Sequence, residues 1–122
     1  MILGLDHVAI ICSSEQSIDF YKHLGFEETC REYRGYDILV FFKGFGFTLE
    51  MFIDPTRPPR VDRPEAMGLR HLALWVDSVE ATLDKLKIND ELEIHAEPIR
   101  IREGKHFTFF KDPDGLPIEL HE

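Results

Sequence analysis

Two histidines and two glutamates occupy matching places in the two halves of the sequence. The segments LDHVAIIC and LRHLALWV align without a gap and put His7 and His71 at the same position. Glu50, in FTLEMF, and Glu119, in PIELHE, also occupy equivalent places. Two imidazoles and two carboxylates form an N2O2 ligand set that suits Zn²⁺, Ni²⁺, Co²⁺, Mn²⁺ or Fe²⁺. The sequence therefore predicts one divalent metal ion held by these four side chains.

Each of these residues also has an ordinary explanation. A strand histidine is commonly just hydrogen-bonded, and Glu119 fits the solvated face of a half-buried strand because apolar residues alternate around it. Glu50 fits this explanation less well, since its neighbours Leu49, Met51 and Phe52 leave little room for a solvated face. A buried carboxylate needs a partner or a metal. If a pseudo-twofold axis relates the halves, the equivalent residues meet at that axis.

The elements that must position these residues are repeated as well. After residues 5–12, Ser13 and Gln16 form a capping box, and a helical apolar stripe runs to Gly25. After residues 69–76, Asp77 is the expected N-cap of a second helix and Glu80 its partner. The buried stripe of that helix is Val79, Leu83 and Leu86.

Three strand candidates follow each helix. In the first half they are FEETCREY, YDILVFFK and GFTLEMFI, and in the second LEIHAEPIRIR, KHFTFFK and LPIELHE. The four prolines of residues 54–68 exclude regular structure there. We therefore expect an α+β domain over residues 1–122. Its two tandem βαβββ modules, about 1–53 and 69–122, form curved mixed sheets around a central metal cavity.

Composition limits the partners and the compartment. The 122 residues are 43% hydrophobic and 30% charged, as in a soluble globular protein, and carry a net charge of −9. That charge argues against nucleic acid and anionic membranes, and no apolar run reaches the roughly 20 residues of a membrane span. The N-terminus lacks signal-peptide features. Cys12 and Cys30 form no CxxC motif. We expect a cytoplasmic protein with reduced thiols.

The doubled βαβββ pattern with these four residues resembles the vicinal oxygen chelate superfamily, in particular its glyoxalase I branch. The resemblance covers the whole chain. The segments RPEAMGLRHLALWVD and FTFFKDPDGLPIELHE are most similar to a group of small bacterial glyoxalase-like proteins. This family groups glyoxalases with bleomycin resistance proteins and dioxygenases.

The resemblance implies a metal-dependent lyase or isomerase acting on a small substrate with vicinal oxygens. In that chemistry a proton moves between neighbouring carbons through a metal-stabilised enediolate. The residue equivalent to Glu119 is both metal ligand and catalytic base in glyoxalase I, and Glu50 can act from the opposite side. The resemblance also implies a homodimer.

The chain departs from the glutathione-dependent enzymes at two positions. They usually carry an arginine four residues after the first histidine and an asparagine four after the first glutamate. Ile11 and Asp54 stand there in this chain. Methylmalonyl-CoA epimerases differ in another way, because they typically have glutamine where Glu50 stands. These differences disfavour a methylglyoxal–glutathione substrate.

Two alternative functions remain open. One is an epoxide-opening resistance enzyme of the fosfomycin type, and the other a metal-free sequestering module of the bleomycin-binding type. Several other polar residues are weaker candidates for a site: Arg57, Arg60, Arg63, Arg70, Lys105 and His106. No role is assigned to His23, His95 or His121, and the prominent aromatic residues are expected in the core or at a dimer interface. These are Trp75, Phe41, Phe42, Phe109 and Phe110.

Overall fold

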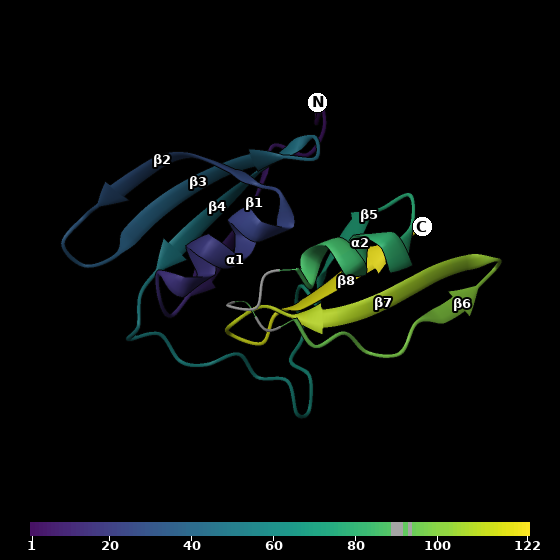
Figure 1. The fold of residues 1–122 in the computed structure, drawn as a ribbon. Helices are drawn as coiled ribbons and strands as arrows, with labels where there is room; N and C mark the ends of the chain where they lie inside the picture. Colours follow the sequence, from purple (N-terminus) through teal and green to yellow (C-terminus); the bar gives the residue numbers. More distant parts are fainter. Residues whose placement is uncertain (89–91, 93) are drawn as a thin grey trace. The chain divides into compact units, whose positions relative to one another are not determined.

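A computed structural model describes residues 1–88, 92 and 94–122 (Figure 1). The chain divides into two compact units, Met1–Pro58 and Pro59–Glu122. Within the described residues, each unit has the element order β-α-β-β-β that the repeat predicts, so the α+β class is confirmed. The elements of the first unit are β1 His7–Cys12, α1 Gln16–Leu24, β2 Glu27–Tyr33, β3 Ile38–Gly44 and β4 Phe47–Ile53. Those of the second are β5 Leu72–Trp75, α2 Val79–Leu86, β6 Arg100–Arg102, β7 Lys105–Lys111 and β8 Pro117–His121.

The two sheets have the same topology. Their strand orders are β1-β4-β3-β2 and β5-β8-β7-β6. In each sheet the first strand pairs in parallel with the last, and the other pairings are antiparallel. The register places Glu50 between Ala9 and Phe41, and it places Glu119 between Ala73 and Phe109. The two glutamates are therefore twins in the sheets as well as in the sequence.

Strand alternation explains which face each glutamate occupies. Leu49 and Met51, on either side of Glu50, are fully buried, as is Ile118 beside Glu119. Each sheet is covered on one face by its own helix (Figure 1), and the buried residues of that helix complete the core of the unit. Because successive strand residues point to opposite faces, both glutamates lie on the face opposite the core positions.

The helix starts differ from the sequence predictions. The first helix begins at Gln16 with Glu15 in the N-cap position, so the prediction of Ser13 as N-cap is wrong. The chain already turns at Ser14, whose carbonyl accepts the N–H of Ser17, and Ser13 comes too early in the chain. Gly25 ends the helix as predicted, with a φ of 114° that glycine adopts without steric cost.

The second helix is capped by Ser78, one residue after the predicted Asp77. Its side chain accepts a hydrogen bond from the N–H of Ala81, because its extended backbone points the hydroxyl at the first turn. The buried stripe of Val79, Leu83 and Leu86 is confirmed.

The strand predicted over residues 92–102 is largely wrong. Only Arg100–Arg102 forms a strand, residues 94–99 are irregular, and residue 93 lies outside the described residues. Pro98 has no N–H to donate to a ladder, which limits pairing there to single bonds such as that from Glu97 to the carbonyl of Phe109. The proline-rich segment 54–68 contains one isolated bridge, between Asp62 and Glu65. No described helix has the length and apolar character needed to cross a membrane.

Candidate metal centre

In the first unit, the structure brings His7 and Glu50 together. The Nε2 atom of His7 lies 3.1 Å from a carboxylate oxygen of Glu50, whose side chain is 17% exposed. The other ring nitrogen, Nδ1, lies 2.7 Å from a carboxylate oxygen of Asp6. The hydrogen bond to Asp6 raises the pKa of His7, and the charge of Glu50 adds to this shift. Sequence reasoning missed Asp6, although it stands directly before the histidine.

The second unit repeats the pair with a different neighbour. The Nε2 atom of His71 lies 3.0 Å from a carboxylate oxygen of Glu119, and the glutamate side chain is 13% exposed. The ring of His71 also contacts the ring of Phe109 edge-on, with centroids 5.1 Å apart. Here Nδ1 faces a nitrogen of Arg70 at 3.4 Å instead of a carboxylate. The four predicted ligands thus form two pairs, each within its own unit.

Both pairs fit a divalent metal. Ligand atoms bound about 2.0–2.2 Å from an ion stand roughly 3 Å apart when they are adjacent. The observed nitrogen–oxygen separations of 3.1 and 3.0 Å match this spacing. In the first pair the Asp6 carboxylate lies behind the ring of His7, so a neutral imidazole that donates from Nδ1 presents the lone pair of Nε2 on the Glu50 side. A carboxylate behind a histidine is the usual way in which proteins orient a metal-binding imidazole.

A second cluster in the second unit also contains metal-ligand types. His106 Nδ1 lies 2.6 Å from a carboxylate oxygen of Glu80 and 3.7 Å from one of Glu122. The Glu80 contact is an ion pair by distance but not an aligned hydrogen bond. Glu122 also accepts the N–H of Val79 at the start of α2. That bond is the main reason why the pKa of Glu122 is lowered, and the backbone N–H and ring of His106 add to it.

This cluster has a structural role that needs no metal. The Glu122 carboxylate stabilises the N-terminus of α2, where the helix dipole is positive, and ties it to β7 and β8. Glu80 and His106 are both partly exposed, so their contact is screened by solvent. The cluster is therefore a matched control for the two histidine–glutamate pairs.

Most of the linker arginines are held by the chain itself. Arg57 pairs with Asp54, Arg60 donates to the carbonyl of Arg70 at 2.7 Å, and Arg70 makes two bonds to the Glu65 carboxylate. Arg63 and Arg70 line a cavity of about 850 Å³ in the second unit, together with Phe107 and Phe109.

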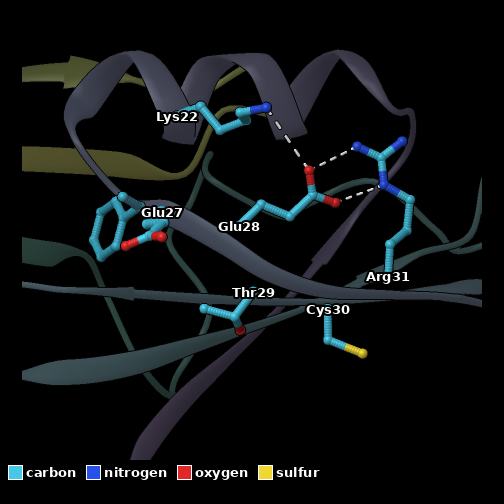
Figure 2. A pocket seen from close by; sticks show the side chains of 7 residues that line it. Lys22, Glu27, Glu28, Thr29, Cys30 and Arg31 are labelled. Carbon is cyan, nitrogen blue, oxygen red and sulfur yellow. Dashed lines mark hydrogen bonds and ion pairs between the residues drawn. The ribbon is translucent and has the colours of Figure 1, made fainter.

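A groove of about 580 Å³ in the first unit carries charged residues as well. Figure 2 shows the carboxylate of Glu28 directed at Lys22 and Arg31, while Cys30 points away from it. The two Arg31 bonds, at 2.6 and 2.9 Å, lower the pKa of Glu28, and Lys22 contributes at 3.8 Å. The carboxylate is thus neutralised locally. We assign this groove no chemistry.

Two βαβββ units with a histidine–glutamate pair in each have the architecture of the vicinal oxygen chelate proteins. The chain belongs to the Glyoxalase/Bleomycin resistance protein/Dioxygenase superfamily, which matches residues 4–120. The resemblance noted in the sequence is therefore confirmed.

Relatives extend over the whole chain. It is 46% identical over 129 residues to the protein YwkD of Bacillus subtilis (strain 168), covering 100% of this chain and 98% of the relative. The crystal structure of a glyoxalase family protein from Enterococcus faecalis is 41% identical, with a TM-score of 0.83 and coverage of 98% and 97%. The fosfomycin resistance protein FosX of Listeria monocytogenes is 23% identical, with a TM-score of 0.77 and coverage of 99% and 93%, and it shares the fold.

Proposed function

We propose that this protein is a metal-dependent, glyoxalase-like lyase or isomerase acting on a small substrate with vicinal oxygens. His7, Glu50, His71 and Glu119 would hold the metal. The observation that supports this most strongly is the twin geometry. Each half-buried glutamate lies about 3 Å from the Nε2 atom of a histidine at the equivalent place in its sheet.

The chemistry follows from the residues and the ion that they fit. A bound divalent ion would polarise a substrate carbonyl and lower the pKa of the neighbouring C–H. Glu119 would take the proton from one carbon and return it to the next, and Glu50 would do the same from the opposite side. Their low exposure limits competition from water for these carboxylates.

The FosX fold offers a chemical parallel. One FosX crystal structure is described as a complex with Mn(II) and 1S,2S-dihydroxypropylphosphonic acid, a molecule with two adjacent hydroxyl groups. A divalent ion and a vicinal-oxygen compound thus occur together in a protein of this fold. For the present chain this supports a metal site that takes a substrate with two adjacent oxygens.

The first test is the metal content of the untagged protein by elemental analysis. We expect about one divalent ion per site in the wild type and its loss in His71→Ala. The matched control is His106→Ala, which removes a partly exposed histidine from the other cluster and is expected to keep the metal. Metal that is retained in His71→Ala and lost in His106→Ala would move the metal site to the Glu80 cluster. Absence of metal after supply of Ni²⁺, Zn²⁺ or Mn²⁺ would refute the proposal.

A second test separates the reactions. The metal-loaded protein is offered dicarbonyl–thiol adducts and, separately, small epoxides, and turnover is followed by proton NMR. Turnover of the adducts that is lost in Glu119→Gln supports proton transfer by this carboxylate. Turnover of epoxides alone would reassign the protein to epoxide opening.

We propose a homodimer as the assembly. The strands β1 and β5 are edge strands, and each exposes a large apolar residue at the same place, Ile11 at 59% and Trp75 at 90%. Edge strands with exposed apolar side chains are usually covered by a partner. Analytical ultracentrifugation of the wild type beside Trp75→Ser tests the homodimer. A wild type that sediments as a monomer would contradict the proposal.

A further inference from the structure

The second unit has an aromatic and cationic surface beside its histidine–glutamate pair. The guanidinium of Arg100 lies over the ring of Phe107 at 5.0 Å and over that of Phe109 at 5.6 Å. Phe109 also contacts His71 and is the cross-strand partner of Glu119. Arg100 and His71 therefore both contact the ring of Phe109. A single small molecule is large enough to reach both of them.

The charges of Arg100 are only weakly engaged by the protein. Among the described residues its ion pair is a single contact of 3.3 Å to Glu97, and both side chains are more than half exposed. Exposed pairs of this kind contribute little and are easily exchanged. The guanidinium has five N–H donors, so most of them remain available to a ligand. The two rings hold its plane in place and reduce the entropy lost on binding.

The cavity around Arg100 has more positive charge than its own acids neutralise. Its basic lining residues among the described ones are Arg63, Arg70, Arg100, Arg102 and Lys111. Arg70 pairs with Glu65, and Lys111 lies 3.6 Å from Asp62. Asp112 accepts the backbone N–H groups of Asp114 and Leu116. Arg63 and Arg102 make no ion pair within the described part of the chain, so two further cations face the cavity beside Arg100.

The first unit shows what a fully engaged arginine looks like. Arg34 also lies over two aromatic rings, those of Tyr36 and Phe52, at 5.0 and 5.4 Å. It is locked by Asp37 through two short contacts of 2.6 and 2.5 Å. Arg34 therefore has the same aromatic setting as Arg100 without the available donors.

We propose that Arg100, on its Phe107 and Phe109 platform, binds an oxyanion of the substrate, a carboxylate or a phosphonate or phosphate group. This inference rests on the proposed function and narrows its substrate class. The substrate would carry vicinal oxygens toward His71 and Glu119 and an oxyanion toward Arg100. Planar guanidinium groups recognise both kinds of oxyanion through paired N–H donors.

The test uses full-length protein and two pairs of probes. Methylphosphonate is compared with its neutral isostere dimethyl sulfone, and acetate with acetamide, at constant ionic strength. Binding is followed by backbone amide shifts in two-dimensional NMR. We expect the anions to shift amides around Arg100 and Phe107 and the neutral probes to leave them unchanged. The stronger of the two anions identifies the group.

Four variants make the result specific. Arg100→Gln is expected to weaken anion binding about tenfold or more, since charge-assisted hydrogen bonds are lost. Glu97→Gln is expected to tighten it a few-fold because a competing carboxylate is removed. Arg34→Gln, the matched control, and His71→Ala are expected to leave it unchanged. The spectra themselves report whether each variant is folded.

The outcomes separate this inference from the proposed function. Unchanged binding in Arg100→Gln, equal binding of the neutral probes, or loss of binding in His71→Ala would overturn the oxyanion site. Metal content is measured on the same samples. A wild type that binds anions through Arg100 but holds no metal would refute the proposed function and leave the oxyanion site standing. A protein that holds metal at His71 but does not bind the anions would refute the oxyanion site and leave the proposed function standing.

Discussion

The same cross-strand row has different residues in the two units. In the first it runs through Ile11, Phe52, Leu39 and Glu32, and in the second through Trp75, His121, Phe107 and Arg100. The backbone plan is repeated, but the end of the row changes from an acid to a base. The two units therefore share the histidine–glutamate pair and differ in the surface beside it. The proposed oxyanion site therefore has no counterpart at this row of the first unit.

The two histidines also differ in their second neighbour. Asp6 lies 2.7 Å from Nδ1 of His7 and can only accept a hydrogen bond there, which favours the neutral tautomer that presents its Nε2 lone pair to a metal. Arg70 can only donate, so its contact with Nδ1 of His71 favours the tautomer whose Nε2–H points to Glu119. The first pair is prepared for a metal. At His71 the contact with Arg70 opposes the form that binds a metal through Nε2.

The largest expected effect is on the free energy of unfolding. It tests whether the cores of the two units are equally packed at equivalent positions. Leu49 and Ile118 are twins on the core face, and both are fully buried. Replacing either with alanine removes buried methyl groups and leaves a cavity, so each should cost about 2–5 kcal/mol in the free energy of unfolding. Urea denaturation measures this. Ile101→Ala, at an exposed strand position, is the control and should change stability by less than about 0.5 kcal/mol. A cost in only one of the two core variants would break the equivalence.

A smaller effect is expected from the neighbours of the histidines. Asp6→Asn should lower metal affinity about 10–100-fold, because the carboxylate that orients His7 is lost. Arg70→Gln should not weaken metal binding, since the side chain that opposes the required tautomer of His71 is removed. Competition with a metal chelator measures both affinities. Weaker metal binding in Arg70→Gln, with unchanged binding in Asp6→Asn, would show that Arg70 supports the metal site and that Asp6 does not.

The sequence predicted the features that repeat. The repeat predicts the element order and the strand positions of both glutamates. Helical spacing predicts the buried stripe of α2, and a glycine after the last apolar residue predicts the end of α1 at Gly25. The pairing of each histidine with its glutamate is within reach of such reasoning, because the parallel register of the first and last strands is the same in both units. That all four side chains bind one metal ion stays a prediction.

Features that depend on single side chains were out of reach. The sequence pattern predicts one strand over residues 92–102 and so does not predict the row that ends in Arg100, because Pro98 delays pairing until Arg100. The Glu80, His106 and Glu122 cluster joins a helix start to two strand ends, and no sequence spacing predicts it.

The helix starts give the smallest effect and the last contrast between the units. Ser78 caps α2 with its side chain, whereas α1 begins at Glu15 without a side-chain cap. Ser78→Ala should therefore cost about 1 kcal/mol, because the N–H of Ala81 loses its acceptor. Asp77→Ala, at the position that the sequence favoured, is the matched control and should cost less. Thermal unfolding and amide exchange in the first turn of α2 measure both. If Asp77→Ala proved the more costly, the cap would lie where the sequence placed it, and the Ser78 hydroxyl would have no stabilising role.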